Sequence, residues 1–138
     1  MPRVLIVDDE PDILLMLRVN LETQGYETAI AADGETALAR VGEHSFDLML
    51  LDVMMPVMDG WGVLENLARI TDPPRVIVVS AKSSERDVAR ALEAGALDYM
   101  TKPFSPKELG EIVEDVLRLD PARFEAHRQA RLVRAQPQ

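Results

Sequence analysis

The sequence predicts an α/β domain in which helices cover both faces of a parallel sheet. Strand-like and helix-like segments alternate along the chain, the pattern that a doubly wound sheet requires. The apolar runs at residues 4–7, 48–51 and 76–79 are typical of strands buried on both faces. With 138 residues, of which 47% are hydrophobic, the chain is long enough for one domain with a real core.

Five strands are expected in order. They cover about residues 3–7, 27–32, 47–52, 75–80 and 98–101. The second alternates apolar and polar residues, which indicates a position at the edge of the sheet. The fifth is short and leads directly into Lys102 and Pro103.

A helix is expected after each strand, each with its own local signals. The helices cover about residues 11–24, 34–41, 60–69, 85–94 and 106–119. Asp33 is placed to cap the second helix, and Ser83 or Ser84 the fourth. Ser105 opens a capping box with Glu108, so the fifth helix begins at residue 106.

The domain is expected to cover residues 1–120, followed by an Arg-rich segment. Residues 121–138 contain four Arg and one Glu, a net charge of +3 in a chain whose total is −9. We expect this segment to be a frayed tail or linker, because chain termini are usually poorly ordered. The alternative is a short helix through Phe124, Leu132 and Val133.

Composition excludes several classes of function. The net charge of −9 argues against direct nucleic-acid binding by the domain. No apolar stretch approaches the ~20 residues of a membrane span, and the N-terminus shows no signal peptide. The absence of cysteine rules out disulfides and thiolate metal ligands, and a cytoplasmic location is expected.

Polar residues follow four of the strands at the point where each strand ends. They are Asp8 and Asp9, Asp52, Ser80 and Lys102. Each has an ordinary explanation, since acids and lysines on loops are mostly just solvated. Parallel strands, however, bring these ends to one rim, where open α/β sheets bind their ligands. Clustered carboxylates without His or Cys suit Mg²⁺ best, with Mn²⁺ as a second possibility.

The motifs in this order resemble the CheY-like receiver domain of a two-component response regulator, similar to the receivers of the OmpR/PhoB class. The residues that carry the resemblance are 7–10, 51–60, 79–81, 94–96 and 99–104. The resemblance implies a flavodoxin-like three-layer sandwich with strand order 2-1-3-4-5. It also implies a phosphorylation switch that promotes its own phosphotransfer and autodephosphorylation, and no other enzyme activity.

The resemblance further implies a role for each acid. Asp52 would accept a phosphoryl group from a sensor histidine kinase or a phosphotransfer protein. Asp9, Asp52 and the Met54 backbone carbonyl would bind Mg²⁺, with Asp8 acting through a metal-bound water.

The remaining roles concern the switch. Lys102 would contact the phosphoryl oxygens, and the peptide between Lys102 and Pro103 would be cis. The Ser80 hydroxyl would move toward the phosphoryl group, and the rotamer of Tyr99 would follow. The output surface would be the fourth helix, fifth strand and fifth helix, which would contact a downstream protein or an attached output domain.

Some alternatives and departures stay open. One alternative is a phosphatase of the haloacid dehalogenase type, but that class would need an acid where Met54 stands. Another is a flavin-binding, flavodoxin-like module, but the acids at residues 8–10 would repel the phosphate of the flavin. A docking scaffold without phosphorylation would not need the complete acid, hydroxyl and lysine set. Ile112 and Leu119 stand where the OmpR/PhoB class often has basic residues, which argues against charge-paired dimerisation.

Overall fold

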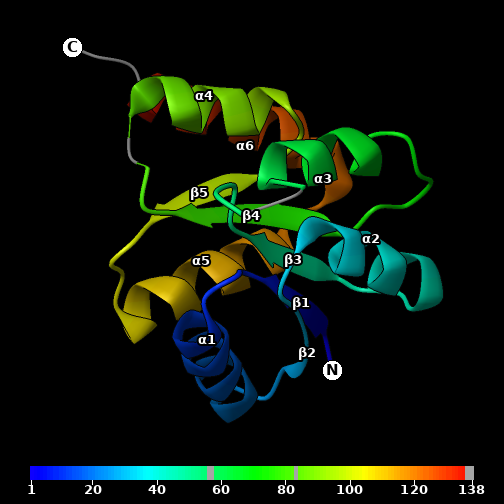
Figure 1. Cartoon of the computed structure of the whole chain (residues 1–138). Helices are drawn as coiled ribbons and strands as arrows, with labels where there is room; N and C mark the ends of the chain where they lie inside the picture. Colours follow the sequence, from blue (N-terminus) through cyan, green and yellow to red (C-terminus); the bar gives the residue numbers. More distant parts are fainter. Residues whose placement is uncertain (56–57, 83, 136–138) are drawn as a thin grey trace.

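The computed structural model describes residues 1–55, 58–82 and 84–135, and it shows one five-stranded parallel sheet (Figure 1). The strands are β1 (Arg3–Val7), β2 (Glu27–Ala31), β3 (Leu48–Leu51), β4 (Arg75–Ser80) and β5 (Asp98–Thr101). Their order is β2-β1-β3-β4-β5, and every neighbouring pair is parallel. The predicted fold class and strand order are confirmed.

Helices cover both faces of the sheet and complete a three-layer sandwich (Figure 1). They are α1 (Pro11–Thr23), α2 (Gly34–Glu43), α3 (Gly60–Leu67), α4 (Glu85–Glu93) and α5 (Pro106–Arg118). Helices α1 and α5 pack on one face, and α2, α3 and α4 on the other. The observed ends agree with the predicted ranges to within two residues.

The central strands are buried on both faces because successive side chains point to opposite sides. In β1, Val4 and Ile6 join the core beneath α1 and α5, whereas Leu5 and Val7 join the core beneath α2, α3 and α4. All four residues of β3 are buried in the same alternating way. A slip of one residue would exchange the two cores, so the register is firmly specified.

Local signals at the helix starts are present as expected. Asp33, Ser84 and Ser105 each accept a hydrogen bond from the backbone N–H three residues ahead, at 2.7, 3.1 and 3.1 Å. Ser83, the other candidate cap for α4, lies outside the described residues. Residues 56 and 57, within the range 51–60 that carries the resemblance, also lie outside the described residues.

The segment after residue 120 is not the frayed tail that we expected. It forms ordered structure that includes the helix given as the alternative. A 3₁₀ turn, η1 (Pro121–Arg123), leads into helix α6 (Phe124–Ala135). Helix α6 packs against α4 (Figure 1). Leu132 and Phe124 join the two cores, and the Arg75 guanidinium lies 5.0 Å from the Phe124 ring centre. These contacts offset the loss of chain entropy that frays a terminus. The domain boundary at residue 120 stays a prediction.

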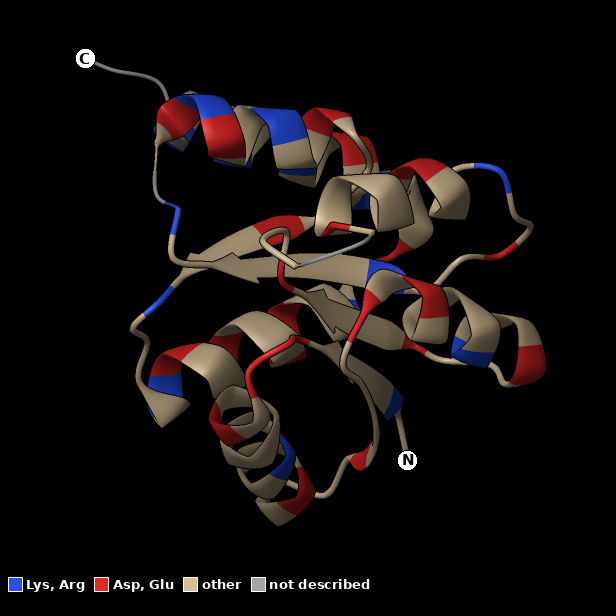
Figure 2. Cartoon of the chain, viewed as in Figure 1, with Lys and Arg blue, Asp and Glu red and all other residues tan. Residues whose placement is uncertain are grey.

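Charged residues lie mainly on the helices and loops, while the middle of the sheet is largely free of them (Figure 2). Helix α4 shows this clearly, with acidic and basic residues interspersed along its length. Within the described ranges, no helix combines the length and the apolar character that crossing a bilayer needs.

Gly60 controls how closely α3 approaches the end of β3. A Cβ atom at this position would lie 2.5 Å from the Asp52 carbonyl oxygen and 2.5 Å from the Val53 Cα. Both are backbone atoms, which cannot rotate away. Only glycine therefore lets α3 begin directly against the segment that carries Asp52.

We predict that Gly60→Ala destabilises the domain by about 1–3 kcal/mol, the usual cost of forcing an extra carbon into a packed interior. Chemical unfolding measures this directly. The matched control is Gly42→Ala in α2, where an added Cβ meets nothing within 4 Å. Alanine should be neutral there or stabilise the helix by up to about 1 kcal/mol. Equal effects at the two positions would contradict the close approach.

Candidate functional site

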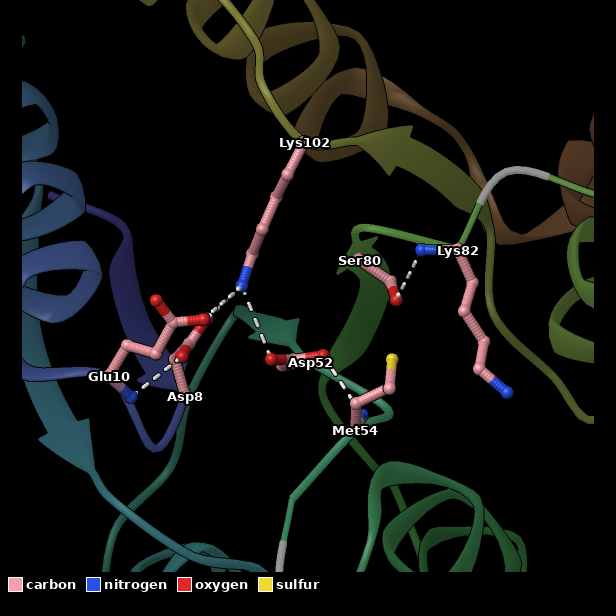
Figure 3. A network of polar contacts seen from close by, with 7 residues as sticks. All are labelled: Asp8, Glu10, Asp52, Met54, Ser80, Lys82 and Lys102. Carbon is pink, nitrogen blue, oxygen red and sulfur yellow. Dashed lines mark hydrogen bonds and ion pairs between the residues drawn. The ribbon is translucent and has the colours of Figure 1, made fainter.

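The carboxyl ends of the parallel strands gather the predicted polar residues at one rim (Figure 3). Asp8 follows β1, Asp52 follows β3, Ser80 ends β4 and Lys102 follows β5. Asp8, Asp52 and Ser80 are almost fully buried. The sheet therefore brings together side chains that lie up to 94 positions apart in the chain.

Lys102 joins two of the acids. Its Nζ lies 2.7 Å from an Asp8 oxygen and 3.2 Å from an Asp52 oxygen, and 3.8 Å from a Glu10 oxygen (Figure 3). The side chain of Lys102 is only 13% exposed, so water screens these ion pairs little. The peptide between Lys102 and Pro103 is cis, as the resemblance implied.

Four carboxylates converge beside the ammonium group. Asp8, Asp9, Glu10 and Asp52 each offer one oxygen, and these oxygens lie within 4.8 Å of one another. Asp9 and Glu10 are exposed, whereas Asp8 and Asp52 are buried. Glu10 was not predicted as a site residue, although its place directly after Asp8 and Asp9 in the sequence was a signal for it.

Two backbone N–H groups orient the buried acids. The N–H of Glu10 donates to Asp8 at 2.9 Å, and the N–H of Met54 donates to Asp52 at 2.9 Å. These bonds leave the other oxygen of each carboxylate to Lys102. The Met54 side chain itself is about half exposed, and a role of its carbonyl in metal binding stays a prediction.

The electrostatics of the rim favour a bound cation. Burial raises the pKa of Asp52, against the lowering effects of the Met54 N–H and of Lys102, and the charge of Asp8 raises it further. Burial alone would lower the pKa of Lys102, but its bond to Asp8 and the charge of Asp52 outweigh burial and raise it. Lys102 thus stays charged, whereas burial makes ionisation of Asp52 less favourable than in water.

The donor set fits a hard divalent cation. Clustered carboxylate oxygens are the ligands that Mg²⁺ and Mn²⁺ prefer, and no softer ligand belongs to the cluster. An ion here would also relieve the repulsion between acids that burial has brought together.

Ser80 and Tyr99 are linked through one residue of the loop after β4. The N–H of Lys82 donates to the Ser80 hydroxyl at 3.2 Å, and its carbonyl accepts from the Tyr99 hydroxyl at 2.7 Å. Tyr99 is only 2% exposed, and burial raises the pKa of its hydroxyl. The resemblance implied that the rotamer of Tyr99 follows the movement of Ser80. In this structure the ring already occupies the buried position.

Comparison with known proteins identifies the family. The family model described as "Response regulator receiver domain" matches residues 4–114. The chain belongs to this family. Receiver domains are phosphorylation switches that interact with histidine kinases, so the predicted class is confirmed.

Similar receivers occur in transcriptional regulators. The chain is 43% identical over 116 residues to the alkaline phosphatase synthesis transcriptional regulatory protein PhoP of Bacillus subtilis, a match that covers 84% of this chain and 48% of that protein. It is 44% identical over 117 residues to the transcriptional regulatory protein PrrA of Mycobacterium tuberculosis, covering 85% and 50%. The chain thus spans about half the length of these relatives. Because these relatives are transcriptional regulatory proteins, they give no support to our expectation that the domain does not bind nucleic acid.

Solved structures agree with this assignment. A CheY-like receiver domain protein from Methanospirillum hungatei has a TM-score of 0.80 and 35% identity, covering 85% of this chain and 94% of that one. The response regulator TrrA of Thermotoga maritima, solved in complex with Mg²⁺ and BeF, has a TM-score of 0.76 and 34% identity, covering 84% and 99%.

We predict that Asp52→Asn stabilises the metal-free domain, by an amount that grows with pH. Because the folded pKa of Asp52 lies above its unfolded value of about 3.9, wild-type stability falls as pH rises through the folded pKa. The amide cannot ionise and avoids this loss, so the gain should increase above about pH 4 and then level off.

Urea unfolding from pH 3.5 to 8 in EDTA measures this gain. The exposed Asp115→Asn is the matched control and should show little pH-dependent difference from wild type. A constant offset for Asp52→Asn across the whole range would contradict the raised pKa.

Proposed function

We propose that this chain accepts a phosphoryl group on Asp52, from a sensor histidine kinase or a phosphotransfer protein, and changes conformation in response. The observation that carries the proposal is the Lys102 ammonium set between Asp8 and Asp52, beside four converging carboxylates. A buried acid with a cation at its free oxygen is suited to attack phosphorus. The proposal includes the cytoplasmic location expected from the sequence.

The transfer needs little covalent chemistry from the protein. An Asp52 carboxylate oxygen bonds to phosphorus as the phosphorus–nitrogen bond of phosphohistidine breaks, and the histidine nitrogen keeps the electron pair. Charge spreads over three phosphoryl oxygens, so positioning and neutralisation supply most of the rate. Lys102 provides a fixed positive charge at the attacked rim, and the Met54 N–H orients the nucleophile.

Mg²⁺ completes the proposed site. Asp9, Asp52 and the Met54 carbonyl would hold it, with Asp8 acting through a water. When bound, the ion supplies positive charge to the phosphoryl oxygens and offsets the carboxylate cluster. The same groups would also admit the water that later hydrolyses the acyl phosphate, so the switch resets itself.

The response travels through the loop after β4. A phosphorylated Asp52 carries two negative charges that seek donors, and the Ser80 hydroxyl can turn toward them. Ser80 would then give up its bond to the Lys82 N–H, and Lys82 also holds the Tyr99 hydroxyl. The loop, Tyr99 and α4 therefore move as one unit. The output face comprises α4, β5 and α5, and it would contact a downstream protein or an attached output domain.

We predict that Asp52→Asn abolishes phosphate uptake from acetyl phosphate in the presence of Mg²⁺. The amide keeps the shape of the side chain but cannot form an acyl phosphate. Intact-protein mass spectrometry detects the added group. Asp115→Asn, an exposed change of the same kind, should be phosphorylated like wild type. Uptake by Asp52→Asn at the wild-type rate would show that another residue is the acceptor.

We predict that Mg²⁺ stabilises the unphosphorylated domain and that Asp9 is needed for this. A ligand that binds only the folded state at ten times its Kd adds about 1.4 kcal/mol. The melting temperature should therefore be higher in Mg²⁺ than in EDTA, both for wild type and for the control Asp115→Asn. The difference should shrink for Asp9→Ala. An unchanged Mg²⁺ response in Asp9→Ala would remove Asp9 from the ligand set.

A further inference from the structure

Helix α6 lies beyond the part of the chain that the receiver family accounts for. The family model ends at residue 114. The match to the structure from Methanospirillum hungatei covers 94% of that chain but only 85% of this one. Helix α6 nevertheless packs on α4 beside β5, which is part of the proposed output face (Figure 1). It is an addition placed on the surface that should report phosphorylation.

Polar contacts hold α6 to the start of the edge strand β5. Arg131 Nε lies 3.0 Å from an Asp98 oxygen, and His127 Nε2 lies 3.4 Å from the other. Arg128 donates to the backbone carbonyls of Gly95 and Ala96, at 2.9 and 3.2 Å. The Asp98 side chain is 12% exposed, so this ion pair is partly shielded from water.

The same helix reaches the switch tyrosine. An Arg131 Nη2 donates to the Tyr99 carbonyl at 3.4 Å, and Leu132 packs against the core cluster that contains Tyr99. Tyr99 stands on the edge strand β5, and its side chain belongs to the core cluster that α4 covers. Docked α6 packs on α4, and its Arg131 bonds to β5 at Asp98 and at the Tyr99 carbonyl.

We propose that α6 is a built-in effector: docked on α4 and β5, it holds Tyr99 in the buried position and thereby strengthens phosphoryl binding at Asp52. This inference rests on the proposed function. The chain of contacts runs from Arg131 through Tyr99 and Lys82 to Ser80. Because linkage is reciprocal, a phosphoryl group on Asp52 must in turn tighten the docking of α6.

Two variants loosen α6 by different means. Arg131→Glu places an acid against Asp98, and Leu132→Ala removes an apolar contact without changing charge. Arg134→Glu is the matched control, since Arg134 is an exposed arginine on the same helix. Hydrogen exchange of amides 124–135 reports docking. Titration with beryllium fluoride and Mg²⁺ in the full chain, followed by the fluorescence of Trp61, the one tryptophan, reports phosphoryl-mimic affinity.

We expect faster exchange in α6 for Arg131→Glu and Leu132→Ala, and at least about fivefold weaker beryllium fluoride binding. Arg134→Glu should match wild type in both measurements, and beryllium fluoride should slow exchange in wild-type α6. Faster exchange with unchanged or tighter binding would overturn the effector role, and so would unchanged exchange in both variants. Failure of wild type itself to bind beryllium fluoride would instead overturn the proposed function, and this inference with it.

Discussion

The contact between Lys102 and the carboxylates of Asp8 and Asp52 is the interaction on which the site depends. An exposed ion pair contributes little to stability. The side chains of Lys102, Asp8 and Asp52 are largely buried, so each charge needs an oppositely charged partner. Without Lys102 the sheet would force two buried acids together with nothing to balance them. With it, the rim keeps an excess of negative charge and one fixed positive charge, the features that the proposed cation and phosphoryl group would require.

The geometry of that contact is a consequence of the core. Strands β1 and β3 are buried on both faces, so neither can slide without exchanging its two apolar sides. Asp8 and Asp52 directly follow these strands, and Gly60 lets α3 pack closely behind the second. A rigid support of this kind positions catalytic atoms at no cost at the moment of reaction. Burial by the same support raises the pKa of Asp52, so the ionised carboxylate is disfavoured there.

Sequence predicted the parts of this structure that depend on local signals. Apolar runs located the strands, and Asp33 and Ser105 marked helix starts, because strand burial and capping are properties of neighbouring residues. The predicted site residues meet because parallel strands end at one rim. Helix α6 was only the less favoured alternative, since its stability comes from contacts with distant residues such as Asp98 and not from its Arg-rich sequence. The buried rotamer of Tyr99 likewise depends on tertiary packing.

The position of α6 changes what an output partner can do. A densely packed interior moves between discrete arrangements, so the Lys82 loop, Tyr99 and α4 have few ways to respond to charge at Asp52. Helix α6 touches the same strand and helix from outside. Under the proposed coupling, a partner that binds docked α6 together with α4 would favour the phosphorylated state. A partner that draws α6 away would favour the opposite state. Both effects would follow by linkage from that coupling and would require no direct contact with Asp52.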